Sequence, residues 1–185
     1  FFLDSDDWIE NITLYELVNS IKKFETELCI CGFCYETDGR SKKCDIDVEF
    51  PMQQKEFREK YFWELYENAI LFNVGTKLYK NDIIKKNNIR FQENMSVYED
   101  ICFFLDYLSH TKNLSFCKES FYHYFQGNSK SITHNYRSGF WIDTVSYYNK
   151  LEAVSEQRTD ELNKALLICL YRAFLQESHN PRLDK

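Results

Sequence analysis

Apolar side chains recur every three or four positions along several stretches of this 185-residue chain, a spacing that gives an amphipathic helix one buried face. Thr13 with Glu16, and Ser96 with Glu99, match the capping box that opens many helices, and Thr159 is the expected cap of the last helix. The predicted helices cover Thr13–Phe24, Gln54–Ile70, Asn81–Lys86, Ser96–Leu108, Tyr136–Leu151 and Thr159–Phe174.

Runs rich in apolar and aromatic residues, bounded by polar turns, predict strands. The clearest is Glu27–Glu36, whose continuous apolar character indicates a buried strand that ends in a turn at Asp38-Gly39. Leu114–Cys117 and Phe121–Phe125 predict two adjacent antiparallel strands, followed by a loop at Gly127–Ser129. Shorter strands are predicted for Phe1–Leu3, Asp45–Phe50, Gly75–Lys80 and Ile89–Phe91.

This succession of strands and helices, without an internal repeat or a low-complexity linker, predicts an α/β fold, α+β within this chain: a short mixed sheet flanked by helices. We expect residues 1–135 to form the sheet-containing part and residues 136–185 to form a helical pair packed on it. The composition agrees, because 44% hydrophobic residues suffice for a core, and 5 Gly and 2 Pro leave little length for loops.

Charge and cysteine usage narrow the function classes. A formal net charge of −6 argues against a nucleic-acid binder that neutralises phosphates. No apolar run is long enough to span a membrane, no signal-peptide pattern is present, and seven cysteines without secreted-scaffold spacing favour the cytoplasm. Cys29, Cys31, Cys34 and Cys44 suggest zinc, but strand alternation would turn Cys34 away from Cys29 and Cys31, so we interpret these thiols as small core residues.

The most informative stretch is the acidic cluster of Asp4, Asp6 and Asp7, which follows three apolar residues and precedes Trp8. Carboxylates this close repel one another, and a hard divalent cation such as Mg²⁺ or Mn²⁺, held by Asp side chains, phosphate oxygens and water, would compensate them. The alternative is a structural Asp-rich turn in which Asp7 caps a short helix. An EF-hand is excluded, since Ile9 and Tyr15 stand where its Gly and Glu would be.

Three further motifs follow the cluster: Lys77-Leu78-Tyr79-Lys80, Ile89-Arg90-Phe91 and Tyr98-Glu99-Asp100-Ile101-Cys102-Phe103. Together with Phe2-Leu3-Asp4-Ser5-Asp6-Asp7-Trp8, in this order, they resemble the bacterial family 2 glycosyltransferases of the GT-A fold. The resemblance covers residues 1 to about 135 and implies the C-terminal portion of a GT-A domain, beginning at its D-x-D motif. The two C-terminal helices lie outside it.

The resemblance implies inverting transfer of a sugar from a nucleotide-diphosphate donor to a hydroxyl in a bacterial surface polysaccharide or glycan. Asp4-Ser5-Asp6 matches the D-x-D motif, with Asp6 as the direct Mg²⁺ or Mn²⁺ ligand, Asp4 as a ribose or metal contact and Asp7 as support. The Glu-Asp pair matches Glu99 and Asp100, with Asp100 as the base on the acceptor side. Glu99 is also accounted for as part of a capping box, whereas Asp100 has no local duty beyond a favourable charge near a helix N-terminus.

Further expectations concern ligands and partners. Lys77, with Tyr79 and Lys80, is expected to line the acceptor or diphosphate side, although an exposed Lys is often simply solvated. The partners implied are a nucleotide-diphosphate sugar and a saccharide or lipid-linked saccharide, with no nucleic acid. Peripheral contact with the inner face of the membrane and a homodimer both stay open. His123 and His134 lie where the family places a loop that closes over the donor, but we interpret each as structural because neither has a mapped partner, and His110 and His179 are expected at helix ends.

Two departures and two alternatives accompany the resemblance. Gly75-Thr76 stands where relatives often carry Trp, which leaves the acceptor-site wall undefined, and the family's N-terminal half, with its base-binding acidic residues, has no counterpart in this chain. We therefore expect a fragment that is inactive alone. One alternative is a haloacid dehalogenase-like phosphatase with Asp4 as nucleophile and Asp6 as acid/base, disfavoured by Asp7. The other is a non-catalytic helical interaction domain.

Overall fold

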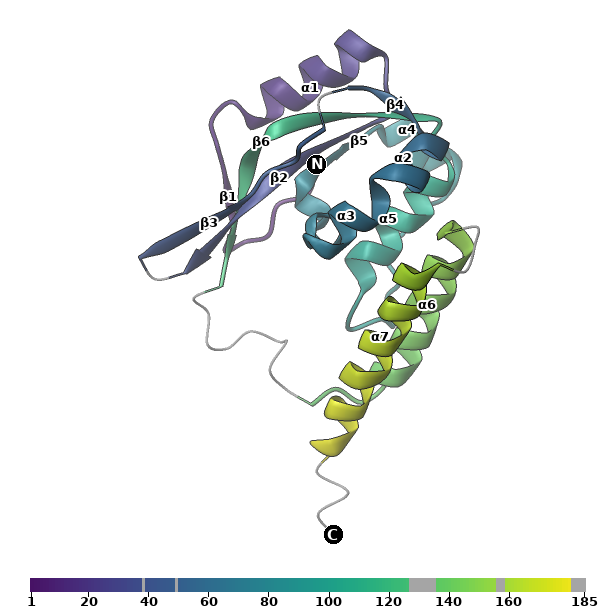
Figure 1. The fold of residues 1–185 in the computed structure, drawn as a ribbon. Helices are drawn as coiled ribbons and strands as arrows, with labels where there is room; N and C mark the ends of the chain where they lie inside the picture. Colours follow the sequence, from purple (N-terminus) through teal and green to yellow (C-terminus); the bar gives the residue numbers. More distant parts are fainter. Residues whose placement is uncertain (38, 49, 127–135, 156–158, 181–185) are drawn as a thin grey trace.

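The computed structural model describes residues 1–37, 39–48, 50–126, 136–155 and 159–180. Its centre is a curled mixed sheet in the order β1-β6-β2-β3, with β4 also paired to β6 and β5 to β2 (Figure 1). The predicted α/β class is confirmed. The strands are β1 (Trp8–Ile9), β2 (Leu28–Thr37), β3 (Arg40–Cys44), β4 (Met52–Gln53), β5 (Lys77–Tyr79) and β6 (Asn113–Phe125).

The parallel pair of β2 and β6 forms the core of the sheet. The first seven residues of β2 are all buried, as expected for a strand covered on both faces. The pairing shifts register around Gly32, where an added Cβ would lie 2.5 Å from the Cys44 carbonyl oxygen, so only glycine fits this approach. Strict alternation therefore does not extend across Gly32, and it cannot be used to place Cys34 opposite Cys29 and Cys31.

β6 is a single strand of thirteen residues rather than two antiparallel ones, so that prediction was wrong. Lys118 and Glu119 separate the two predicted runs, but the chain passes through them extended, with the Lys118 carbonyl accepting from the Ile46 amide. Because β6 pairs with β1, β2 and β4, tertiary hydrogen bonding carries it through this polar segment.

Helix α1 (Thr13–Phe24) covers one face of the sheet (Figure 1). Leu17 packs against Cys29, Cys31 and Phe121. The helix was predicted correctly, but its capping box was not: the Thr13 hydroxyl donates to the Phe121 carbonyl instead of capping the helix. The side chain thus fastens α1 to β6.

The other face is covered by α2 (Gln54–Lys60), α3 (Phe62–Glu67) and α5 (Glu99–Ser109), as Figure 1 shows. One long helix was predicted for Gln54–Ile70, but it breaks at Tyr61 and ends before a left-handed Ala69 and the 3-10 turns η1 (Ile70–Phe72) and η2 (Val74–Thr76). The predicted stripe is nevertheless buried at Phe57, Phe62 and Leu65.

The remaining short elements match the predictions in part. β5 leads into α4 (Asn81–Lys86) as expected. Residues 45–48 and 89–91, by contrast, form no strand, and residues 1–3 precede β1 without pairing. After the Gly39 turn, β3 pairs with β2. No strand was predicted there, because Arg40–Lys43 is charged and lacks apolar residues. Asp38 and the loop predicted at 127–129 lie outside the described residues.

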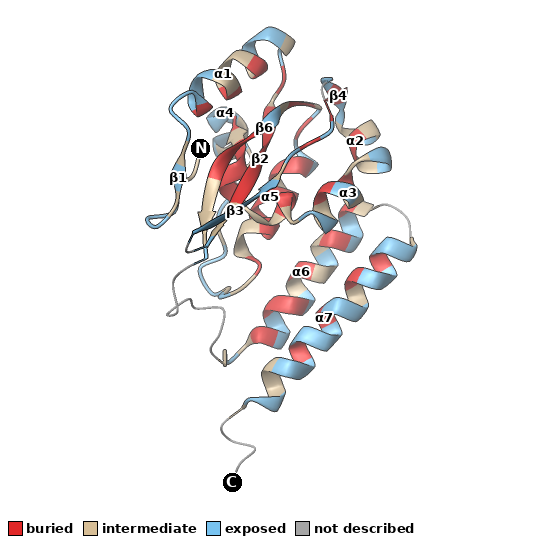
Figure 2. Ribbon diagram, turned by 60° about the vertical axis from the view of Figure 1, so that its left-hand side comes forward, coloured by how far each residue is buried: buried red, intermediate tan, exposed pale blue. Residues whose placement is uncertain are grey.

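Helices α6 (Phe140–Ser155) and α7 (Asp160–Ser178) form the predicted C-terminal pair, with the Thr159 hydroxyl accepting from the Leu162 amide as its cap. Their facing sides are buried and their outer sides exposed (Figure 2). The inner residues join the same apolar core as α5, and buried Asp143 accepts hydrogen bonds from the Ser96 amide and hydroxyl. No helix in the described ranges is long and apolar enough to span a bilayer.

Candidate active site

The acidic cluster forms a tight turn at the head of β1. The Asp7 amide donates to the Asp4 carbonyl at 3.2 Å, and β1 then pairs antiparallel with β6. The Asp-rich turn expected in the structural alternative is therefore present. The short helix that Asp7 was to cap is not, since a strand follows.

β6 holds this turn in place through Tyr122, a residue that sequence reasoning missed. Its buried hydroxyl donates to Asp7 Oδ2 at 2.5 Å and lies 3.4 Å from the Asp4 amide. The Phe125 amide donates to Asp7 Oδ1 at 2.9 Å. Both oxygens of Asp7 are therefore engaged by β6, which makes Asp7 a positioning residue. The aromatic alternation of β6 gave no signal for this role.

Gly75 explains how the Tyr122 ring reaches this position. A Cβ at Gly75 would lie 2.3 Å from Tyr122 Cε2 and 3.0 Å from the Phe2 carbonyl oxygen. The ring therefore rests directly on the Gly75 backbone, a packing that any larger residue would block. The departure noted at Gly75-Thr76 is thus a structural accommodation of Tyr122.

Asp4 and Asp6 both line an open cavity of about 1150 Å³, together with Glu99 and Asp100 from the start of α5. The structure thus brings together the D-x-D motif and the predicted base, which are separated by more than ninety positions in the chain. The sheet contributes Phe33 and Tyr35 of β2 and Tyr124 and Phe125 of β6. The helical side contributes Trp63, Tyr66, Tyr98, Glu161, Lys164, Ala165, Ile168 and Arg172.

The electrostatics of this cavity are dominated by carboxylates. Burial raises the pKa of Asp4, and the neighbouring charges of Asp7, Asp6 and Glu99 raise it further. Burial, Glu99 and Asp4 together raise the pKa of Asp100 to about 7. Carboxylate oxygens that face an open cavity and repel one another are a donor set suited to a hard divalent cation. The residues present therefore fit Mg²⁺ or Mn²⁺ at Asp4 and Asp6.

Asp100 is placed by the start of α5, which differs from the expected capping box. Tyr98 precedes the helix in a left-handed conformation, with φ of 66°, and Ser96 binds Asp143 of α6 instead of capping α5. Stacking of Tyr98 on Tyr147, with ring centroids 4.5 Å apart, secures this turn. The C-terminal pair therefore helps to position the candidate base.

Lys77 does not line the cavity and has no exposed surface. Its ammonium donates to the carbonyls of Ile70 and Asn73 at 2.9 and 2.6 Å and to the Thr76 hydroxyl at 2.9 Å. Burial lowers the pKa of Lys77 to about 7. In this position the side chain ties the two 3-10 turns together, and the expected contact with diphosphate or acceptor is not compatible with it.

Helix α7 supplies a cavity wall that sequence reasoning also missed. Glu161, Ala165, Ile168 and Arg172 recur at spacings of three or four and so share one helix face. That periodicity was the signal available in the sequence. Lys164, on the same wall, forms an ion pair with Glu67 of α3 at 2.6 Å.

The histidines have varied environments. His123 stacks on Trp8 outside the cavity, while His110 and His179 stand at the C-caps of α5 and α7, as predicted. The His179 ring contacts the Leu175 carbonyl at 2.7 Å. His134 lies outside the described residues.

Comparisons with known proteins bear on this arrangement. No protein-family model matches the chain. EpsH of Bacillus subtilis, assigned as a glycosyltransferase, is 25% identical over 169 residues, which cover 89% of this chain and 48% of EpsH. TarP of Staphylococcus aureus, a poly(ribitol-phosphate) beta-N-acetylglucosaminyltransferase, is 28% identical over 135 residues, which cover 72% of this chain and 39% of TarP.

The crystal structure of S. aureus TarS with UDP-GlcNAc superimposes with a TM-score of 0.60 and 18% identity, covering 94% of this chain and 48% of that one. The chain thus resembles family 2 glycosyltransferases in sequence and shares the GT-A fold of TarS. It spans about half, or less, of the length of these relatives. That the sequence relatives are glycosyltransferases favours this family over the phosphatase-like alternative.

Proposed function

We propose that this chain is the D-x-D-bearing, acceptor-side portion of an inverting glycosyltransferase that transfers a sugar from a nucleotide diphosphate to an acceptor hydroxyl. The observation that carries the proposal is the single cavity onto which Asp4, Asp6 and Asp100 all open. An inverting displacement needs a charge-stabilising group on the leaving side and a base on the attacking side of one substrate. A helical interaction domain would have no need for this convergence.

Asp6 and Asp4 would hold the Mg²⁺ or Mn²⁺ ion. When bound, the ion would supply positive charge to the departing diphosphate. Asp7, gripped by Tyr122 and the Phe125 amide, keeps the turn in a fixed geometry, so that Asp4 and Asp6 need little reorganisation on binding. We assign Asp7 this supporting task instead of direct ligation.

Asp100 would take the proton of the acceptor hydroxyl. A carboxylate with a pKa raised to about 7 is a stronger base than an ordinary aspartate, and about half of it is ionised near neutral pH. The cause is burial beside Glu99 and Asp4, so the cavity itself sets this basicity. A cation at Asp4 would favour the ionised form.

The acceptor would lie between the aromatic side chains Trp63, Tyr66 and Tyr98 and the wall made by α7, the side of the cavity opposite the sheet. Aromatic lining with a few convergent polar groups is typical of small-molecule sites. We propose a saccharide or lipid-linked saccharide as acceptor, acted on at the cytoplasmic face of the membrane. Because TarS was solved with UDP-GlcNAc, a uridine diphosphate sugar is the first donor to test.

The D-x-D assignment is tested by titrating the protein with Mn²⁺ and following the loss of the free-ion electron paramagnetic resonance signal. Asp6→Asn should weaken binding by about tenfold or more, because it removes an anionic ligand. Asp47→Asn is the matched control, since Asp47 is an exposed acid paired only with Lys118 at 3.6 Å among the described residues. Equal Mn²⁺ affinity in Asp6→Asn and the wild type would refute the assignment.

The base assignment needs a transfer assay on a complete glycosyltransferase that contains this portion. Asp100→Asn should retain Mn²⁺ and donor binding while transfer falls roughly 10²- to 10⁴-fold. A normal transfer rate in this variant would exclude Asp100 as the base. For the isolated chain we expect little heat in calorimetry with a uridine diphosphate sugar and Mn²⁺, and micromolar binding would mean that its nucleotide site is more complete than we propose.

A further inference from the structure

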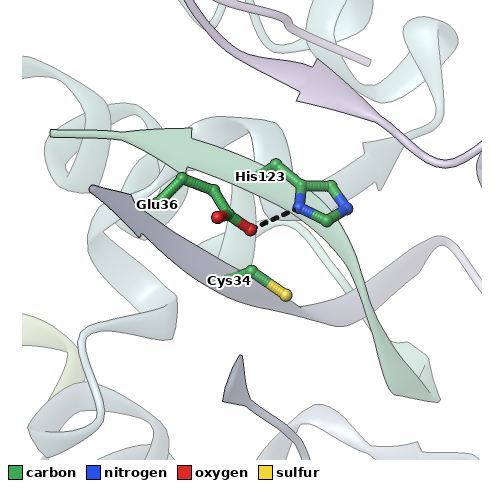
Figure 3. A group of neighbouring side chains, drawn as sticks. All are labelled: Cys34, Glu36 and His123. Atoms are coloured by element: carbon green, nitrogen blue, oxygen red, sulfur yellow. Dashed lines mark hydrogen bonds and ion pairs between the residues drawn. The ribbon is translucent and has the colours of Figure 1, made fainter. Parts of the chain in front are cut away.

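Three side chains with metal-binding atoms converge on the sheet, outside the cavity. Cys34 and Glu36 are alternate residues of β2, and His123 is the cross-strand partner of Cys34 on β6 (Figure 3). The Cys34 Sγ, a Glu36 carboxylate oxygen and a His123 ring nitrogen all lie within 4.8 Å of one another. We propose that these residues form a second cation site, for Zn²⁺ or a similar borderline metal, distinct from the D-x-D site.

The two sites would lie on opposite faces of the same strands. Tyr35 and Tyr124 line the cavity, and Cys34, Glu36 and His123 alternate with them along β2 and β6. Successive side chains of a strand point to opposite faces, so the convergence lies behind the cavity floor. Nothing in the proposed transfer reaction uses it.

The spacing suits a small four-coordinate ion. Bonds of about 2.0–2.3 Å in tetrahedral geometry separate neighbouring ligand atoms by roughly 3.3–3.8 Å. Rotations of the side chains would close the present spacing to this value without moving either strand. Cys34 is 1% exposed, whereas the Glu36 and His123 side chains are each 14% exposed, so an ion would enter past the Glu and His and reach the thiol last.

The surroundings of His123 resemble those of a metal-ligating histidine. Its Nε2 lies 3.0 Å from Glu10 Oε1, and its Nδ1 lies 2.8 Å from Glu36 Oε1, toward the convergence. Metal-bound imidazoles commonly donate their other N–H to a carboxylate, which fixes the ring and the tautomer, and Glu10 is placed for that task. Trp8 stacks on the ring with a 5.0 Å centroid separation and an 8° interplanar angle, which holds its orientation.

The donor set decides the metal. A thiolate and an imidazole select Zn²⁺ or Co²⁺, whereas Mg²⁺ and Mn²⁺ prefer oxygen ligands such as those of Asp4 and Asp6. Binding would release the Cys34 thiol proton to solvent, and the N–H of the neutral His123 ring would lie on Nε2, toward Glu10. The fourth position would be left to water. Because the ligands come from β2 and β6, a bound ion would cross-link the two strands that form the floor of the cavity.

The test is a Co²⁺ titration of the protein, followed by visible absorption and by competition with Zn²⁺. We expect about one equivalent of Co²⁺ to give intense d–d bands, together with a sulfur-to-cobalt charge-transfer band that Zn²⁺ abolishes. Cys34→Ser should remove the charge-transfer band, and His123→Gln should weaken binding by more than about tenfold. Glu10→Gln should weaken it by roughly 10- to 100-fold.

Cys44→Ser is the matched control, because Cys44 belongs to neighbouring β3 and lies outside the convergence. Circular dichroism identifies a variant that fails to fold. If Cys34→Ser does not fold, His123→Gln, at a partly exposed position, still provides a decisive test. Absence of a charge-transfer band in the wild type, or its persistence in Cys34→Ser, would overturn the proposal. Asp6→Asn should leave the Co²⁺ spectrum unchanged, which separates this site from the D-x-D assignment.

Discussion

The Tyr122 hydroxyl offers a sharp test of how the D-x-D turn is held. In Tyr122→Phe the ring stays, but the hydrogen bond to Asp7 and the contact with the Asp4 amide are lost. A hydrogen bond to a charged acceptor contributes about 1.5–3 kcal/mol. Asp7 is only partly buried and keeps the Phe125 amide, so water can replace part of the loss. We therefore expect the free energy of unfolding to fall by about 2 kcal/mol.

Tyr79 provides the matched control. It is also buried, at 6% exposure, but its hydroxyl has no hydrogen-bond partner among the described residues. A buried hydroxyl without a hydrogen-bond partner carries an uncompensated desolvation cost, and the substitution removes it. Tyr79→Phe should therefore be neutral or stabilising by up to about 1 kcal/mol. The two substitutions delete the same atom from the same residue type, and only the hydrogen bonding differs.

Urea unfolding monitored by circular dichroism measures both variants, and a double-mutant cycle with Asp7→Asn isolates the Tyr122–Asp7 coupling. If the hydroxyl positions the turn, Tyr122→Phe should also weaken Mn²⁺ binding several-fold, whereas Tyr79→Phe should not. Equal unfolding free energies for the two variants, or zero coupling in the cycle, would refute the reasoning.

Three further predictions follow from the same contacts. Gly75→Ala should destabilise the protein by about 1–3 kcal/mol in urea unfolding, because its Cβ would collide with the buried Tyr122 ring. Asp143→Ala should cost about 2–4 kcal/mol and speed hydrogen exchange at the Ser96 amide, which would lose its acceptor. The third prediction concerns pH. Folded Asp100 keeps its proton up to about pH 7, whereas an unfolded aspartate loses it near pH 3.8. Between these pH values the folded state therefore binds more protons than the unfolded state, and the free energy of unfolding of the wild type falls as the pH rises. In metal-free buffer Asp100→Asn should lack that part of the decline, on the order of 2–4 kcal/mol, and parallel pH profiles would contradict it.

Local patterns predicted most helices and the buried strand β2 because apolar periodicity and chain stiffness act within a few residues. The capping boxes failed for the opposite reason. Thr13 and Ser96 had the right neighbours in sequence, but the Phe121 carbonyl and the Asp143 carboxylate offered their hydroxyls tertiary partners. The prediction of two strands in place of β6 was wrong for a similar reason, since pairing with distant strands holds its polar centre extended.

The residues of the candidate site likewise fall into those that local motifs indicate and those that depend on tertiary contacts. Asp4, Asp6 and Asp100, which line one cavity, could be proposed from the sequence because their motifs keep chemistry and spacing together. Tyr122 could not, since its role depends on a β6 register that places it beneath the turn. Lys77 was misassigned because a lysine beside a motif suggests a ligand contact, and nothing local reveals that the surrounding carbonyls capture its ammonium.

The parallel pairing of β2 with β6 also has a kinetic consequence. Leu28 of β2 hydrogen-bonds alongside Leu114 of β6, so most of the chain must be synthesised and a long loop closed before this pairing can begin. Once the whole chain is made, the helical pair α6–α7 needs only a short connection and can form quickly, whereas the sheet should set the folding rate. Until β6 docks, the apolar β2 strand has an open edge, which makes the nascent chain most prone to aggregation in that interval.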